Sequence, residues 1–234
     1  MNFNVKIFAD GADKLGILEM NKNVFISGFT TNPSLMRKAG VKDYEAFAKE
    51  ILSIIKDKPI SFEVISDDFD EMYVQAKKIS GWGNNVYVKI PIMNTKAVSS
   101  FNLIKRLTNE GIKVNVTAIM TKEQVIEILP ALQNTAGAYV SVFAGRIADS
   151  GRDPIPIMTD VIEIIRSNQN VELIWASPRE LFNLIQADRI GCHIITMTND
   201  LLKKIPLIGK DLNEFSLETV KMFYEDALSS NFQI

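Results

Sequence analysis

The chain has 234 residues, of which 47% are hydrophobic and 23% are charged, and this is the composition of an ordinary globular protein. A formal net charge of −2 gives no basic surface for nucleic acid, and no apolar run reaches the length of about 18 residues that a membrane-spanning helix needs. The single cysteine and the single histidine exclude an internal disulfide and a structural zinc cluster, so we expect a cytoplasmic protein without a metal, a nucleic-acid partner or a membrane anchor.

The chain alternates between short apolar segments and longer segments with a helical period. We predict β-strands at eight segments, residues 5–11, 24–32, 60–66, 86–91, 113–119, 139–146, 171–177 and 193–198. Amphipathic helices are predicted over residues 44–55, 97–107 and 160–167, the first with Phe47, Ile51, Ile54 and Ile55 on one face. Eight strands that alternate with helices predict an α/β fold of the (β/α)8 TIM-barrel type, formed as a single domain by residues 1–234.

A helical tail is predicted after the last strand, over about residues 200–234. Its segment FSLETVKMFYEDAL (215–228) has more apolar surface than a single stripe of one helix requires. We therefore expect the tail both to cap the barrel and to meet another subunit, which predicts a homo-oligomer.

Polar residues interrupt the apolar strands near their carboxyl ends, where a small barrel should present aliphatic side chains. They are Asp10, Asn32, Glu63, Lys89, Asn115, Thr117, Ser141, Arg146, Ser177 and Arg179. Single members have simpler interpretations, because Asp10 and Asn32 can be turn residues and Arg146 and Arg179 can form surface ion pairs. Barrel active sites collect at the carboxyl ends of strands, so the coincidence predicts an active site there. By the same rule His193, at the entry end of the last strand, is expected to be structural.

Lys89 lies inside the apolar run NNVYVKIPIM (84–93), although lysine is among the residues that are least often buried. Burial penalises the charged form of an amine, so we expect a neutral amine that can attack a carbonyl carbon and form a Schiff base. Carbon–carbon cleavage beside the iminium needs further acid/base groups, and Asp10 and Glu63 are carboxylates in the same layer. Amides and hydroxyls can then hold sugar hydroxyls, and the two arginines with Ser177 can hold a phosphate.

Six motifs, in this order, resemble those of the transaldolase family, in particular of its small subfamily that includes the fructose-6-phosphate aldolases. The motifs are GFTTNPSL (28–35), FEVIS (62–66), VKIP (88–91), NVTAI (115–119), SVFAGRI (141–147) and ASPRE (176–180). The resemblance covers about residues 5–200. It implies a class I aldolase-type barrel that uses no metal and no organic cofactor.

The resemblance also implies roles for individual residues. Lys89 is then the Schiff-base lysine, and Asp10 is the acid/base of carbon–carbon cleavage. Glu63 and Thr117 are expected to hold the catalytic water. The residues expected to bind the dihydroxyacetone part are Asn32, Asn115 and Ser141, and those expected to bind phosphate are Arg146, Ser177 and Arg179. The implied reaction moves a dihydroxyacetone unit from a ketose phosphate, such as fructose 6-phosphate or sedoheptulose 7-phosphate, to an aldose phosphate, as in the pentose phosphate pathway.

Two positions favour a transaldolase over an aldolase that releases dihydroxyacetone. The aldolase branch carries glutamine where this chain has Glu63 and tyrosine where it has Phe143, and a phenylalanine near the substrate cannot place water for that release. Gly11 and the last strand ITMT (195–198) depart from the family pattern, which leaves open a transaldolase-like enzyme with a specialised sugar. A barrel that only binds a sugar phosphate, or a structural subunit, is the non-enzymatic alternative.

Overall fold

The computed structural model describes residues 3–133 and 135–230 of the chain. The chain divides into two compact units, residues 1–202 and residues 203–234. The first unit contains the strands, and the second contains the last long helix. The division falls close to the predicted start of the tail.

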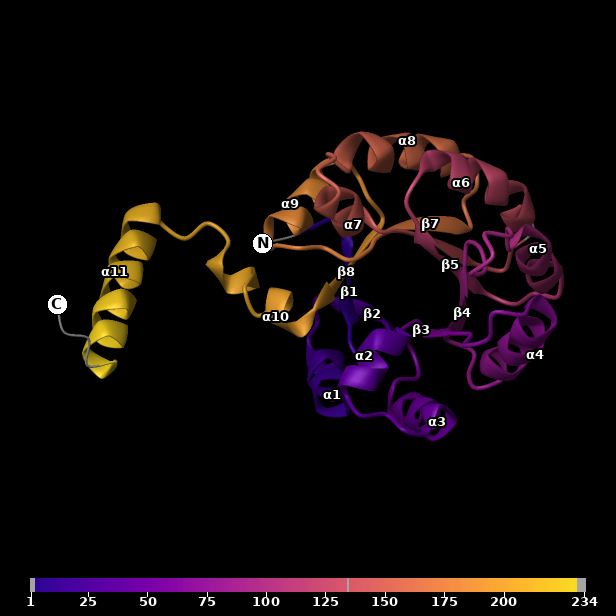
Figure 1. Cartoon of the computed structure of the whole chain (residues 1–234), viewed down its shortest axis with the longest axis horizontal. Coiled ribbons are helices and arrows are strands. Elements are labelled where there is room, and N and C mark those ends of the chain that lie inside the picture. Colours follow the sequence, from indigo (N-terminus) through magenta and orange to yellow (C-terminus); the bar gives the residue numbers. More distant parts are fainter. Residues whose placement is uncertain (1–2, 134, 231–234) are drawn as a thin grey trace. The chain divides into compact units, whose positions relative to one another are not determined.

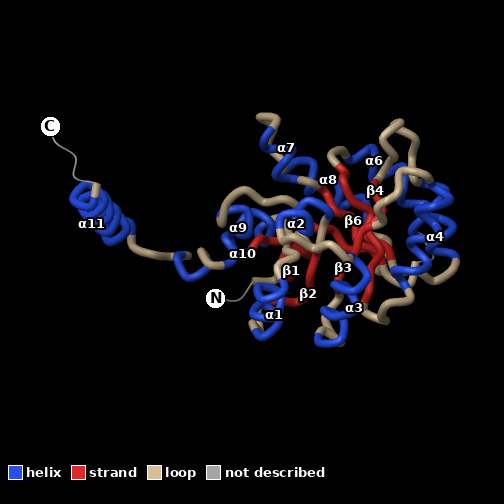
Figure 2. Tube along the Cα trace, turned by 60° about the horizontal axis from the view of Figure 1, so that its bottom comes forward, coloured by secondary structure: helices blue, strands red, loops and turns tan. Residues whose placement is uncertain are grey.

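The first unit is a closed barrel. Within the described residues, eight parallel strands each pair with the next strand along the chain, and the last pairs with the first (Figure 1). The strands are β1 (Lys6–Asp10), β2 (Ile26–Thr30), β3 (Ile60–Glu63), β4 (Val86–Pro91), β5 (Val114–Ile119), β6 (Ala138–Val142), β7 (Val171–Trp175) and β8 (Ile194–Thr198). Helices surround the strands (Figure 2), so the predicted (β/α)8 barrel is confirmed.

The helices of the first unit lie between the strands and after β8. They are α1 (Lys14–Lys22), α2 (Pro33–Lys38), α3 (Tyr44–Ile54), α4 (Phe69–Ser80), α5 (Phe101–Asn109), α6 (Lys122–Ile128) with the 3-10 turn η1 (Leu129–Leu132), α7 (Ala144–Asp149), α8 (Ile155–Ile165), α9 (Phe182–Arg189) and α10 (Asn199–Leu202). Several begin at a side chain that accepts a hydrogen bond from the free N–H groups of the first turn. Asp13, Asp43 and Asp68 cap α1, α3 and α4 in this way, and Thr121 with Gln124 forms a capping box on α6.

The helix predicted over residues 97–107 begins later than expected, at Phe101. The residues before it form a tight loop in which Met93 bridges Ser99 in an antiparallel pair. Ala97 in this loop has a φ of 57°, a left-handed conformation that no right-handed helix contains. Helical periodicity extends through the loop in the sequence, which is why the pattern placed the start of the helix too early.

The helix predicted over residues 44–55 forms as α3, but one of its apolar positions was assigned to the wrong face. Ile54 is 47% exposed, whereas Ile55 is fully buried. The helix ends at Ile54, and Ile55 takes an extended conformation that lets its side chain reach the core. The strand predicted over residues 139–146 also ends early, at Val142, because the chain enters α7 almost at once.

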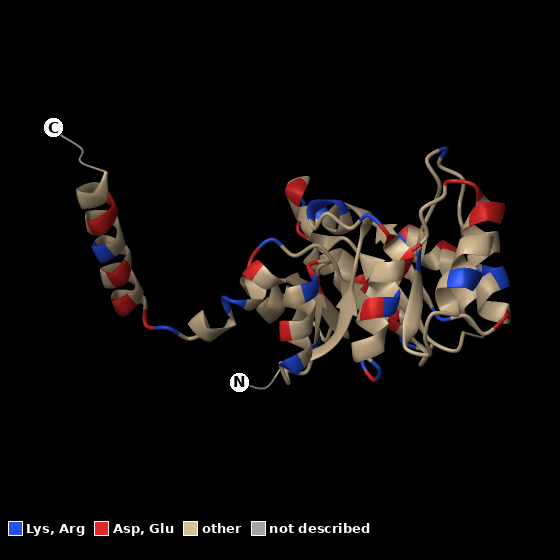
Figure 3. Cartoon of the chain, turned by 90° about the horizontal axis from the view of Figure 1, so that it is seen from below, with Lys and Arg blue, Asp and Glu red and all other residues tan. Residues whose placement is uncertain are grey.

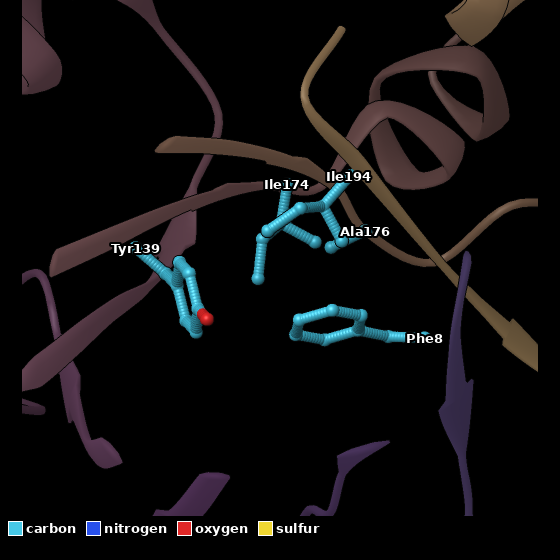
Figure 4. Packing of buried hydrophobic residues seen from close by; sticks show 5 residues of the cluster. All are labelled: Phe8, Tyr139, Ile174, Ala176 and Ile194. Atoms are coloured by element: carbon cyan, nitrogen blue, oxygen red, sulfur yellow. The ribbon is translucent and has the colours of Figure 1, made fainter. Parts of the chain in front are cut away.

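Apolar side chains fill the barrel below the predicted polar layer. The core cluster consists of Phe8, Tyr139, Ile174, Ala176 and Ile194 (Figure 4). The ring of Phe8 meets that of Tyr139 edge to face, with 5.6 Å between the centroids. Gly28 makes room for this ring, because a Cβ atom at that position would lie 2.6 Å from atoms of Phe8. Side chains alternate along a strand, so Phe8 and Asp10 share the inner face of β1 and the apolar cluster supports the polar layer.

The second unit contains the short 3-10 helix η2 (Ile205–Leu207) and the helix α11 (Leu212–Ser229). No described residue of α11 is buried, and large apolar side chains such as Phe215, Met222 and Phe223 are exposed. Charged residues of both signs also occur along this helix (Figure 3). Among the helices of residues 3–133 and 135–230, none combines the length and the apolar character needed to cross a membrane. The role of the tail in capping or assembly stays a prediction.

The close contact between Gly28 and Phe8 predicts that Gly28→Ala destabilises the barrel. The added methyl group overpacks the buried ring, so we expect the free energy of unfolding to fall by about 1–3 kcal/mol. Urea unfolding followed by circular dichroism measures the change. Gly81→Ala is the matched control, because a Cβ atom there meets nothing closer than 3.4 Å and its free energy should stay near that of the native chain. Equal stability of the two variants would contradict the packing argument.

Candidate active site

The carboxyl ends of the strands surround a cavity of about 500 Å³. Most of the predicted site residues line it, namely Asp10, Asn32, Glu63, Lys89, Thr117, Ser141, Phe143, Arg146 and Ser177. Two predicted residues, Asn115 and Arg179, are not part of its lining. Thr30 and Thr196 line the cavity although the sequence analysis did not select them. The barrel closure therefore brings together residues that are spread over most of the chain.

Lys89 lies on the inner face of β4, directly beside Glu63 of β3 in the strand register. Its residue exposure is 6%, and its Nζ atom donates a hydrogen bond to the backbone oxygen of Thr31 at 2.8 Å. The same nitrogen lies 3.1 Å from Oε2 of Glu63. The apolar neighbours Val88 and Ile90 point to the opposite face of the strand. The amine is buried, as the apolar run suggested, but its polar contacts are a backbone carbonyl and a carboxylate.

Asp10 ends β1 and faces the same cavity. Thr30 Oγ1 donates a hydrogen bond to Asp10 Oδ1 at 2.8 Å, and the hydroxyls of Thr30 and Thr196 are hydrogen-bonded to each other. Burial raises the pKa of Asp10 above its ordinary value, and Glu63 raises it further, while the charge of Lys89 and the bond from Thr30 oppose the rise. A carboxyl group with a raised pKa suits proton transfer in both directions.

The two threonines carry a weak signal in the sequence. Thr30 is two residues before Asn32, and Thr196 is two residues after Ile194, so each lies on the inner face of its strand by alternation. Threonine is also common in ordinary strands, however, and nothing in its residue type marks these two positions as part of a site.

Thr117 is buried on the inner face of β5, and its hydroxyl has no hydrogen-bond partner within the part of the chain that the structure describes. Buried hydroxyls are nearly always bonded, so this group, which lines the cavity, is available to a ligand. The next residue, Ala118, has a φ of 61°, and the pairing of β5 with β6 is irregular between Val116 and Ile119. Such irregularities redirect side chains at barrel rims.

Asn115 lies one inward position below Thr117 and is completely buried. Its Nδ2 donates to Ser61 Oγ at 3.0 Å, and Ser141 Oγ donates to its Oδ1 at 2.7 Å. The amide is thus bonded to protein at both ends and supports Ser141, which does line the cavity. For Asn32 the sequence left open a local turn role and a place in the site. The structure shows both features, because Asn32 lines the cavity and its Oδ1 accepts a hydrogen bond from Leu35 N at the start of α2.

One side of the cavity mouth carries the predicted phosphate-binding residues. Arg146 of α7 lines the cavity, whereas Arg179 is paired with Asp149, its Nε donating to Oδ1 at 2.9 Å. Arg179 also donates to Ser177 Oγ at 3.0 Å, and its hydrogen bonds to Asp149, together with its charge, hold the pKa of that carboxyl below the ordinary value. Gly145 lets α7 approach this loop, because a Cβ atom there would lie 1.6 Å from the oxygen of Ser177. Arg179 is therefore placed to orient Ser177.

The histidine and the cysteine lie away from this cavity. His193 precedes β8 at the amino end of the barrel, where its Nδ1 accepts a hydrogen bond from Leu173 N at 3.2 Å and burial lowers its pKa. Cys192 is buried beside it. Across residues 3–133 and 135–230, no group of three or more His, Cys, Asp or Glu side chains is placed to hold a metal ion.

Comparison with known proteins gives one consistent result. A sequence profile of the family described as Transaldolase/Fructose-6-phosphate aldolase matches residues 7–234. A "Probable transaldolase" of Thermoanaerobacter sp. (strain X514) is 38% identical over 216 residues, which cover 90% of this chain and 95% of that protein. A "Probable transaldolase" of Streptococcus equi subsp. equi (strain 4047) is 36% identical over 215 residues, with 90% and 96% covered.

Solved structures resemble the chain at much lower sequence identity. The crystal structure of KGPDC from Streptococcus mutans has a TM-score of 0.55 at 12% identity and covers 86% of this chain and 89% of its own. The crystal structure of 2,3-dimethylmalate lyase has a TM-score of 0.56 at 11% identity, with 98% and 84% covered. At such identities the likeness extends to the barrel fold alone.

The raised pKa of Asp10 predicts a stability change that depends on pH. The folded chain binds this proton more tightly than the unfolded chain, so ionisation costs stability as the pH rises from the ordinary pKa of 3.8 through the raised value. Asp10→Asn removes this cost. The free energy of unfolding of the variant, minus that of the native chain, should therefore be larger at about pH 7 than at about pH 4. Urea unfolding of both chains at both pH values measures this difference.

Asp149→Asn provides the control of opposite sign. Arg179 lowers the pKa of Asp149, so its ionised form contributes stability above pH 3.8 that is lost as the pH falls. The Asn variant should thus lose stability relative to the native chain at neutral pH and lose less in acid. If Asp10→Asn instead lost stability at neutral pH and lost less in acid, as expected for Asp149→Asn, pairing with Lys89 would outweigh burial at Asp10.

Proposed function

This chain belongs to the transaldolase/fructose-6-phosphate aldolase family, and we propose that it transfers a dihydroxyacetone unit from a ketose phosphate to an aldose phosphate through a Schiff base on Lys89. The observation that carries the proposal is a buried amine 3.1 Å from a carboxylate, in a cavity that also contains a second carboxylate of raised pKa. Fructose 6-phosphate and sedoheptulose 7-phosphate are the proposed donors.

The first step forms the covalent bond between enzyme and sugar. Glu63 takes a proton from the Lys89 ammonium, and the neutral amine attacks the ketone carbon of the donor to give a carbinolamine. Loss of the hydroxyl as water, with a proton returned by an acid group, leaves a protonated imine. Glu63 and the hydroxyl of Thr117, which has no hydrogen-bond partner among the described residues, are the groups proposed to hold this water.

The second step breaks a carbon–carbon bond. Asp10 takes the proton from the hydroxyl on the carbon beyond the bond that breaks, and the bonding electrons move into the iminium. An aldose phosphate leaves, and a three-carbon enamine stays on Lys89. The acceptor aldehyde then adds in the reverse sense, Asp10 returns its proton, and hydrolysis frees the new ketose phosphate. Thr30 and Thr196 hold the Asp10 carboxylate in place during these transfers.

The phosphate of the sugar is proposed to bind at the cavity mouth. Arg146 and Ser177 line this part of the cavity and can donate hydrogen bonds to phosphate oxygens. Arg179 is paired with Asp149 and donates a hydrogen bond to Ser177, so we propose that it orients Ser177. The family resemblance implies instead that Arg179 contacts the phosphate directly. Asn32 and Ser141 are left to bind hydroxyls of the dihydroxyacetone unit.

Phe143 favours transfer over release of the three-carbon unit. It lines the cavity and carries no hydroxyl with which to place water against the enamine, so the intermediate waits for an acceptor aldehyde. An aldolase that releases dihydroxyacetone is the alternative within the family, and a transferase with a specialised sugar is another. We further propose a cytoplasmic homo-oligomer that acts in the pentose phosphate pathway, with the exposed apolar residues of α11 as its contact surface.

Reduction of the enzyme in the presence of fructose 6-phosphate tests the proposed intermediate. Borohydride should leave a reduced three-carbon adduct on Lys89, identified by mass spectrometry of the digested chain. Lys89→Ala should lose the adduct and lower turnover by about 1,000-fold or more, while Lys113→Ala, which removes a lysine outside the cavity that bonds the backbone oxygen of Asn84, should keep both. A native chain that binds the sugar but is never trapped would leave only the non-enzymatic alternative.

Phe143→Tyr tests the choice between transfer and release. A phenol at this position can place water against the enamine, so release of free dihydroxyacetone from fructose 6-phosphate alone should rise about tenfold, while transfer to an added aldose phosphate should fall. A coupled assay of dihydroxyacetone reduction measures the release. Phe101→Tyr on α5 is the matched control and should change neither rate. Rapid release by the native chain would instead identify an aldolase.

A further inference from the structure

Tyr44 contacts the backbone of Glu63 from outside the barrel. This tyrosine is the first residue of α3, and its hydroxyl donates a hydrogen bond to the backbone oxygen of Glu63 at 2.9 Å. We propose that Tyr44 is a positioning residue that fixes the Glu63 carboxylate against Lys89. The inference rests on the proposed function, since it assigns Glu63 a part in proton transfer.

The need for such a donor follows from the pairing of β2 with β3. Backbone N–H groups along β2 and just after it donate to oxygens along β3 and just before it at every second residue, from Phe29 to Pro59 at 2.8 Å and from Thr31 to Ser61 at 3.2 Å. The next alternate position is residue 33, where the chain has already entered α2. Residue 33 is a proline and has no N–H group.

The hydroxyl of Tyr44 takes the place of the missing donor. A part-buried carbonyl without a partner would cost free energy, and the phenol removes that cost at the one peptide that carries Glu63. On its other side the same stretch is fixed by Val64 N, which donates to the oxygen of Lys89 at 3.1 Å. The backbone at the catalytic carboxylate is thus bonded on both sides, to β4 through the ladder and to α3 through Tyr44.

The ring of Tyr44 is itself held in one orientation. It meets the rings of Phe62 and Trp82 edge to face, with centroid distances of 6.2 and 5.6 Å. Asp43 caps α3 through Ala46 N and fixes the first turn, in which Tyr44 lies. Burial raises the pKa of Tyr44, so the phenol keeps the proton that it donates.

The side of Tyr44 away from the barrel is not filled by packed side chains. A cavity of about 410 Å³ lies beside Tyr44, between α3 and α4, and is also lined by Ile65 and Trp82. Without the hydroxyl, the Glu63 peptide would lose its hydrogen bond to α3, and a shift of its carboxylate would change the 3.1 Å contact with Lys89. Small displacements at a reacting group reduce the rate strongly.

Tyr44→Phe tests the proposal, because it removes the hydroxyl and keeps the ring contacts. We expect kcat for sugar transfer to fall about tenfold with little change in KM, and the pH–kcat profile to shift. Tyr73→Phe is the matched control, since that phenol donates to the exposed side chain of Glu110 at 2.8 Å and does not line the active-site cavity. Its kcat and pH profile should equal those of the native chain.

A double-mutant cycle separates positioning from a general loss of stability. If Tyr44 acts through Glu63, Tyr44→Phe should have almost no further effect on kcat in a Glu63→Gln background. Equal losses in both backgrounds, or a fall in melting temperature with kcat and pH profile unchanged, would reduce Tyr44 to a structural residue. Borohydride trapping of the native chain separates the two hypotheses: a trapped chain whose Tyr44→Phe variant reacts at the native rate refutes positioning only, and an untrapped chain refutes both.

Discussion

The contact between the buried Lys89 and the carboxylate of Glu63 is the interaction on which the candidate site depends. Removing two charges from water is costly, and a closed barrel repays that cost only if the partners are held in contact and bonded to further groups. Strand register places Glu63 directly beside Lys89, and the oxygen of Thr31 accepts a second hydrogen bond from the amine. The pair also provides what a Schiff base needs, a nucleophile with a proton acceptor in contact.

The remaining layers of the barrel support this pair from below and from outside. Below it, aromatic and aliphatic side chains fill the interior, with Gly28 leaving space for the ring of Phe8. Outside it, Pro33 at the start of α2 has no N–H group to extend the backbone ladder, and the phenol of Tyr44 from α3 donates a hydrogen bond to the backbone oxygen of Glu63. Most of the site is therefore carried by the strands of the barrel, and α7 and the segment after β7 add Arg146 and Ser177 at the edge of the cavity.

The sequence predicted the barrel and most of the cavity lining, because alternation along strands and the polar ends of apolar runs are local patterns. Contacts between residues that only the closed barrel brings together could not be predicted from such local patterns. Nothing local shows that the amide of Asn115 is bonded to two serines, or that Arg179 is paired with Asp149. The left-handed conformation of Ala97 and the exposure of Ile54 were not predicted for a related reason: hydrophobic periodicity does not show where a helix begins or ends.

A crystal structure of the chain after reduction with borohydride and fructose 6-phosphate would test the central claim most directly. The account predicts continuous electron density from Nζ of Lys89 to a three-carbon unit in the cavity, with the Glu63 carboxylate released from its ion pair and the Asp10 carboxyl beside the end of that unit. Density for an intact, unattached sugar phosphate, with Lys89 still bonded to Glu63, would contradict it.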